Sequence, residues 1–94
     1  MHGVSRYKVP EGKLVEVRVD YGDKIEKVEI LGDFFVHPEE AITEIEDGLR
    51  TTEISEGEQG ICRRIKAMAE EKGMELIGVT PEAIAKAIMM AVDA

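Results

Sequence analysis

The chain has 94 residues, of which 44% are hydrophobic and 34% are charged, and its formal net charge is −8. This length and balance predict one globular domain that spans residues 1–94. The negative charge argues against nucleic acid or an anionic membrane as a partner, because both attract a basic surface.

The first part of the chain predicts little regular structure before a short strand. We expect residues 1–6 to be a mobile lead, with a short edge strand over Val4–Val9. Pro10 ends this strand, because proline has no N–H to donate to a neighbouring strand.

A β-hairpin is the clearest element of the sequence. Residues 14–21 alternate between hydrophobic and charged side chains, residues 22–24 form a glycine-containing loop, and residues 25–33 form the second strand. The hydrophobic residues of the second strand break phase, which favours a β-bulge near Glu26–Lys27. The bulged register pairs Val19 with Val28, Val17 with Ile30, and Arg18 with Glu29, the last as a favourable cross-strand charge pair.

The first helix is expected to begin at Pro38 and to run to Arg50. Proline suits the first helical turn, and the two acidic residues after it suit the positive end of the helix dipole. Glu46 and Arg50 have the i, i+4 spacing of a helical ion pair.

Two further helices follow. Ser55 and Glu58 have the spacing of a capping box at the start of the second helix, and Gly73 suits its C-cap. Residues 74–79 are expected to be a short strand or an extended connection. Thr80 and the proline after it predict the start of the last helix.

These elements predict an α+β fold, in which three helices cover one face of a small antiparallel sheet. The sheet consists of the hairpin 14–21/25–33 and the short edge strand. The residues expected to face the core are Val15, Val17, Val19, Val28 and Ile30 from the sheet, with Ile42, Ile45, Ile65 and Ile84 from the helices.

The sequence shows no set of residues typical of a catalytic site. Cys62 lies on a hydrophobic helical stripe, which favours a buried core residue over a nucleophile, and a nucleophile would need His37 as its base. The glycines at Gly12 and Gly32 are too sparse for a phosphate-binding loop. Cys62, His2 and His37 also lack the spacing of a structural zinc site. We therefore expect no catalytic residue and no metal site.

Targeting features favour the cytoplasm. No apolar run approaches the roughly 18 residues of a membrane span, and the opening segment MHGVSRYK lacks the apolar core of a signal peptide. The single cysteine leaves no internal disulfide, which is typical of a reducing compartment.

Two distant segments converge at the end of the hairpin away from its loop. Either register places Gly12–Leu14 beside Gly32–Phe35. Leu14, Leu31 and Phe35 then point to the outer face of the sheet, flanked by Lys13 and Asp33. An exposed apolar patch of this kind predicts a partner surface. Alternatively, helix 38–50 or the N-terminal strand covers it.

The same segments carry a family resemblance that extends over residues 6–92. The matching stretches are Tyr7–Val15 (YKVPEGKLV), Ile25, Ile30–Phe35 (ILGDFF), Pro38–Ala41 (PEEA), Ile45–Leu49 (IEDGL) and Gly78–Glu82 (GVTPE). Together they resemble the C-terminal accessory domain of lipoate–protein ligases, in the form of the stand-alone small subunit of archaeal two-subunit ligases. The chain departs from the family pattern at Glu11, where the family often has a second glycine, which leaves this loop less flexible.

The resemblance implies a fold similar to SufE- and NifU-type scaffolds and a heterodimer with a separate catalytic subunit. That subunit holds ATP, Mg²⁺ and lipoate, forms lipoyl-adenylate, and transfers lipoyl to a lysine of an acceptor domain. The present chain then binds no cofactor alone. We expect its partner interface to contain Gly12, Lys13, Leu14, Leu31, Asp33, Phe34 and Phe35, with Lys13 also close to the nucleotide phosphates.

Two other functions remain open from the residues. One is an iron–sulfur or sulfur-transfer accessory protein of similar fold, which would need several cysteines or a reactive one. The other is a general protein-interaction module unrelated to lipoylation.

Overall fold

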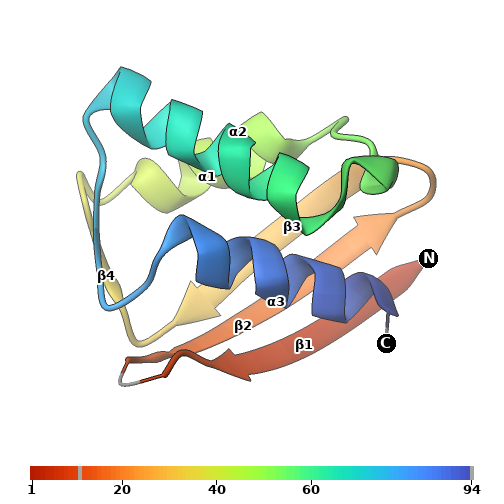
Figure 1. Cartoon of the computed structure of the whole chain (residues 1–94), viewed down its shortest axis with the longest axis horizontal. Helices are drawn as coiled ribbons and strands as arrows, with labels where there is room; N and C mark the ends of the chain where they lie inside the picture. The colour runs from red at the N-terminus through yellow and green to blue at the C-terminus, as the bar shows by residue number, and fades with distance from the viewer. Residues whose placement is uncertain (11, 94) are drawn as a thin grey trace.

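The computed structural model describes residues 1–10 and 12–93. Two layers make up the fold, a three-stranded antiparallel sheet and a layer of three helices on one of its faces (Figure 1). The sheet contains β1 (His2–Lys8), β2 (Leu14–Tyr21) and β3 (Ile25–Gly32), in that order. The α+β prediction is confirmed. Glu11, where the sequence departs from the family pattern, lies outside the described residues.

A second, two-stranded sheet lies at one end of the layers (Figure 1). It pairs β4 (Phe35–His37), which follows the hairpin, with β5 (Glu75–Ile77), which follows the second helix. The sequence left residues 74–79 as a short strand or an extended connection, and the structure forms a strand over Glu75–Ile77 only. Its partner is a three-residue strand that the sequence did not predict.

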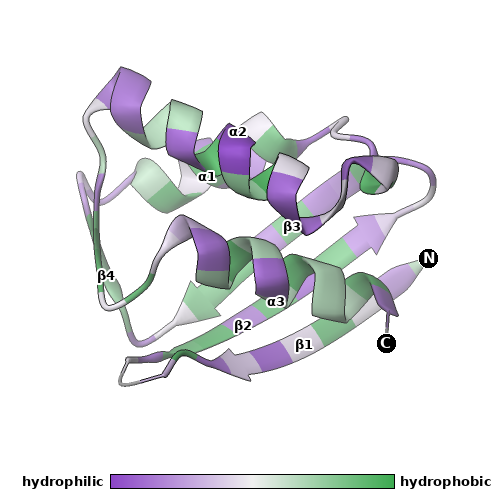
Figure 2. Ribbon diagram, viewed as in Figure 1, coloured by the Kyte–Doolittle hydropathy of each residue, from purple (hydrophilic) through white to green (hydrophobic). Residues whose placement is uncertain are grey.

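The hairpin has the predicted register. Val19 lies opposite Val28 and Val17 opposite Ile30, and a register shift after Asp20 accommodates the bulge at Glu26. The hydrophobic and hydrophilic residues alternate visibly along the strands (Figure 2).

The charge pairs on the outer face of the sheet differ from the prediction. Arg18 and Glu29 lie opposite each other, as expected. However, the Arg18 guanidinium lies 3.1 Å from the Glu16 carboxylate on its own strand, and Glu29 lies 3.8 Å from Lys27. Long charged side chains at an exposed site can form ion pairs of similar energy with several neighbours. The strand register alone therefore does not determine which ion pair forms.

The expectation of a mobile N-terminal lead is wrong. β1 begins at His2 and pairs with β2 along its whole length, and the Met1 ammonium donates a hydrogen bond to the Tyr21 carbonyl at 2.7 Å. Ser5 is buried, and its hydroxyl donates to the carbonyl of Ala87 in the last helix. The buried positions on the inner face of β1 carry small or polar residues instead of large hydrophobic ones. The sequence therefore did not indicate that this strand packs against a helix.

The first helix starts later than predicted. α1 covers Ala41–Leu49, whereas Pro38 lies in the preceding turn and accepts a hydrogen bond from the Ala41 N–H at 3.0 Å. Glu46 does not form the predicted pair with Arg50. Its carboxylate instead accepts the Ile30 N–H at 2.7 Å, because α1 packs against the free edge of β3.

The second helix lacks the predicted capping box. Ser55 lies in a short 3₁₀ turn (Ile54–Glu56), and α2 covers Gly57–Lys72 without a side-chain cap at its start. Its predicted C-cap is confirmed, because Gly73 has a left-handed φ of 64°. α3 (Pro81–Asp93) is capped as predicted, with the Ala83 N–H donating to the Thr80 hydroxyl at 3.1 Å.

The core lies between the sheet and the helices. α3 packs on β1 and β2, α1 packs on β3, and α2 packs against both helices. All five predicted sheet residues are buried, and so are three of the four predicted helix residues, while Ile42 is half-buried against the core. The buried set includes Val15, Val17, Val19, Val28, Ile30, Ile45, Ile65 and Ile84.

Candidate functional site

The two segments predicted to converge lie side by side at the end of the sheet. Val15 of β2 lies opposite Gly32 of β3, and one residue further on the Leu14 N–H donates to the Asp33 carboxylate at 2.9 Å. The loop before β2 is held by its own backbone, because the Gly12 N–H donates to the Val9 carbonyl at 2.9 Å. A side-chain bond thus extends the ladder beyond the last strand pair.

The turn after β5 also lies at this end of the sheet, which the sequence did not predict. The Lys13 N–H donates to the Gly78 carbonyl at 3.4 Å, so the turn after β5 contacts the loop before β2. β5 also places Ile77 directly opposite Phe35 of β4, and opposite residues of an antiparallel pair share one face. The available signal was the short hydrophobic run at 74–79, but its partner strand has only three residues.

Four large hydrophobic side chains are exposed in these segments. The exposed fractions are 69% for Phe35, 49% for Ile77, 44% for Leu31 and 36% for Leu14. The alternative that a helix or the N-terminal strand covers this region is therefore wrong. Phe34, in contrast, is half-buried against the core, as alternation predicts for neighbouring residues.

The expectation that Phe35 lies on the outer face of the hairpin sheet is wrong. Leu14 and Leu31 point to the outer face of the three-stranded sheet, whereas Phe35 belongs to β4 of the separate two-stranded sheet. The chain leaves β3 after Gly32, so alternation counted along β3 does not extend to Phe35. We call the whole region the sheet-end surface, which consists of Gly12, Lys13, Leu14, Leu31, Asp33, Phe34, Phe35 and Ile77.

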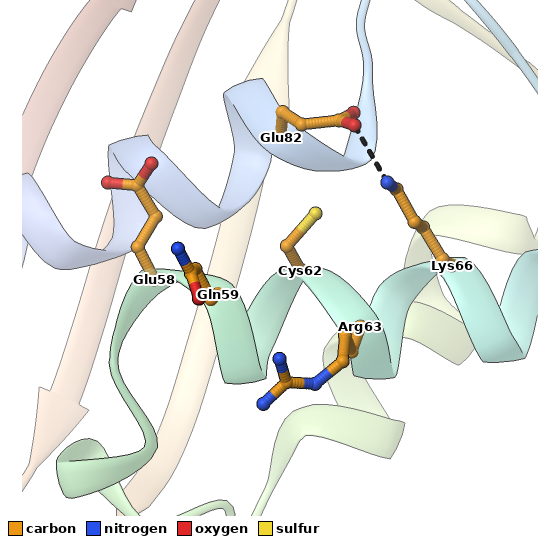
Figure 3. A pocket seen from close by; sticks show the side chains of 6 residues that line it. All are labelled: Glu58, Gln59, Cys62, Arg63, Lys66 and Glu82. Carbon is orange, nitrogen blue, oxygen red and sulfur yellow. Dashed lines mark ion pairs between the residues drawn. The ribbon is translucent and has the colours of Figure 1, made fainter.

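A hollow of about 300 Å³ between α2 and α3 offers a second candidate site (Figure 3). Cys62 points across it toward the helix that carries Glu82, whose carboxylate lies 2.9 Å from the Lys66 ammonium. The other lining residues are Glu58, Gln59 and Arg63.

This hollow does not make Cys62 a nucleophile. The thiol side chain is 8% exposed and packs in the core, as predicted. Burial raises the pKa of the Cys62 thiol, and the Glu82 carboxylate raises it further, so the unreactive protonated form is favoured. His37, the base that a nucleophile would need, lies on β4 opposite Glu75 and does not line the hollow.

The described part of the chain contains neither a cluster of metal-ligating side chains nor a membrane-spanning helix. Within residues 1–10 and 12–93, no three His, Cys, Asp or Glu side chains gather closely enough to hold a metal ion. In the same residues, no helix has the length and apolar character needed to cross a membrane.

Comparison with known proteins gives one informative match. No family model matches the chain, and no curated protein matches it. A solved structure from Thermoplasma acidophilum is similar over 94% of this chain and 94% of its own, with 32% sequence identity and a TM-score of 0.78. That structure is described as an archaeal lipoylation system, a bi-partite lipoate–protein ligase and its E2 lipoyl domain.

Proposed function

Because this chain belongs to the family of lipoate–protein ligase accessory domains, as the small subunit of an archaeal two-part ligase, we propose that it acts with a separate catalytic subunit in lipoate activation. The proposed reaction joins lipoate and ATP to give lipoyl-adenylate and pyrophosphate. The similarity to a bi-partite ligase component over nearly the full length of both chains is the observation that carries this proposal.

The proposed docking site is the sheet-end surface. Phe35 and Ile77 lie opposite each other on a two-stranded sheet and are both largely exposed. Exposed aromatic and aliphatic side chains that gather in one region are typical of protein interfaces. We propose that this surface contacts the catalytic subunit, on which ATP, Mg²⁺ and lipoate are bound.

Docking offers a physical reason for a second subunit. Lipoyl-adenylate is a mixed anhydride that water hydrolyses, and a docked domain excludes water from the site in which it forms. Docking also orders mobile loops around the nucleotide. Lys13 is an exposed residue of this surface, and we propose that its ammonium offsets phosphate charge.

The buried thiol disfavours the sulfur-transfer alternative. A sulfur carrier needs an accessible thiolate, whereas Cys62 is buried and the pKa of its thiol is raised. The geometry therefore supports the ligase role over this alternative.

The test is reconstitution with the cognate catalytic subunit, ATP, Mg²⁺ and lipoate, followed by pyrophosphate release. We expect rapid release only from the mixture, and heterodimer formation by analytical ultracentrifugation. Lipoyl transfer from pre-formed lipoyl-adenylate to the acceptor domain separates activation from transfer. Activation by this chain alone, or by the catalytic subunit at full rate without it, would contradict the proposal.

A further inference from the structure

The turn after β5 contacts Lys13 at Gly78. The backbone of Gly78 bonds to the Lys13 backbone, and the absence of a side chain at Gly78 leaves room for the lysine side chain. The Gly78 carbonyl accepts the Lys13 N–H at 3.4 Å. A β-carbon built on Gly78 would lie 2.9 Å from Lys13 Cγ and 3.6 Å from Phe34 Cβ. The lysine stem therefore passes over the space that a side chain at position 78 would occupy.

The backbone at this position also requires glycine. Gly78 has a φ of 85°, in the left-handed region that residues with a β-carbon rarely adopt. This turn carries the chain from β5 toward α3 while its carbonyl faces the loop before β2. The backbone conformation and the close approach of Lys13 therefore both favour glycine at position 78.

Gly78 directly follows Ile77, the residue opposite Phe35. The pairing of β4 with β5 therefore determines where both the exposed hydrophobic pair and the lysine contact lie. A change at position 78 alters the lysine without removing any exposed hydrophobic side chain.

We propose that Gly78 is a positioning residue that directs the Lys13 side chain toward the nucleotide held by the catalytic subunit. This inference rests on the proposed function, in which Lys13 offsets phosphate charge. Gly78 acts through Lys13 and does not itself touch the nucleotide.

The chain contains a matched control for the test. Gly73 also has a left-handed φ, of 64°, but a β-carbon built there meets no atom within 4 Å. Gly78→Ala and Gly73→Ala both place a β-carbon at a residue with positive φ, and only the first introduces a contact with Lys13. Gly73→Ala therefore controls for the loss of glycine at a positive φ.

The first measurement is the rate of pyrophosphate release by the reconstituted heterodimer. We expect both Gly78→Ala and Lys13→Ala to slow adenylation by about 10- to 100-fold, because misplacement of a positioning group by about 1 Å has effects of this size. Gly73→Ala should keep at least about half the wild-type rate, and the affinity of Gly78→Ala for the catalytic subunit should change by less than about threefold. Gly78→Ala and Gly73→Ala with equal rates would overturn the proposal.

The second measurement is a double-mutant cycle between positions 13 and 78. If Gly78 acts through Lys13, the double variant K13A/G78A is no slower than K13A alone. If the rate loss of the double variant equals the product of the losses of the two single variants, the two residues act independently and the proposal is overturned.

A third measurement covers the case in which Gly78→Ala is too unstable to assay. Thermal melting of the same variants should show that Gly78→Ala loses more stability than Gly73→Ala, and that Lys13→Ala restores part of the difference. A double variant that melts no higher than Gly78→Ala would overturn the contact itself. Absence of adenylation by the wild-type pair would instead contradict the proposed function, and the melting cycle would still test the contact.

Discussion

Two regions of the molecule use the same residue types in opposite ways. On the helix-covered face, Ile84 of α3 has no exposed surface, and its neighbours from the sheet are equally buried. On the sheet-end surface, Ile77 is 49% exposed and lies beside the still more exposed Phe35. Burial on the first face stabilises the fold, whereas exposure on the second leaves apolar area free for a partner.

Truncation of one isoleucine in each region gives the largest expected difference. Ile84→Ala should lower the free energy of unfolding by about 2–5 kcal/mol, because it removes buried apolar atoms and leaves a cavity. Ile77→Ala should lower it by less than about 1 kcal/mol, because half of that side chain already contacts water. Urea denaturation measures both values. Equal losses would mean that the two regions do not differ in their contribution to stability.

The next largest effect concerns association. Phe35→Ala should weaken binding to the catalytic subunit by at least about 2 kcal/mol, or roughly 30-fold, if Phe35 anchors the interface. Met90→Ala is the matched control, since Met90 is also exposed (38%) but lies on α3. Isothermal titration calorimetry measures both affinities, after thermal melting has shown that the variants fold.

Unchanged affinity of a folded Phe35→Ala would remove the sheet-end surface from the interface. A loss of affinity in Met90→Ala of the same size would instead move the interface toward α3. Either result would show that the high exposure of Phe35 does not by itself identify the partner surface.

The sequence predicted the helix-covered face well for a physical reason. Alternation along 14–21 and 25–33, and the bulge near Glu26, follow from the requirement that one face of a sheet be buried. A one-residue slip of β3 against β2 would move Val28 and Ile30 from the core to the outer face of the sheet. The positions of these core residues were therefore determined by local pattern alone.

The sheet-end surface was only partly predictable. Adjacency of Leu14 and Asp33 follows from the hairpin register, so the pattern placed these two residues correctly. The contribution of Ile77 and Gly78 depends on a three-residue strand pair between segments about forty residues apart, and such a short pair leaves almost no periodic signal. The start of α1 was missed because a proline also fits a turn, which is where Pro38 lies.

The smallest expected effect extends the comparison to two carboxylates. Glu46 on α1 is half-buried against β3, and Lys27, Glu29, Asp47 and Arg50 lie around it. Burial raises the pKa of the Glu46 carboxyl, although the hydrogen bond from the Ile30 N–H opposes this. Glu82 is exposed, and the hydrogen bond from Lys66 holds its pKa below the usual value.

The two pKa directions predict opposite pH dependence. The folded state protonates Glu46 more readily than the unfolded state, so wild-type stability relative to Glu46→Gln should rise as the pH falls from about 7 toward the unfolded pKa of 4.5. The ion pair of Glu82 stabilises the fold above its unfolded pKa of 4.5, so wild-type stability relative to Glu82→Gln should fall as the pH drops below that value. Urea denaturation across this pH range measures both differences. Both should be small, because neither carboxylate is fully shielded from solvent. Parallel curves for the two variants would show that burial does not distinguish the two carboxylates.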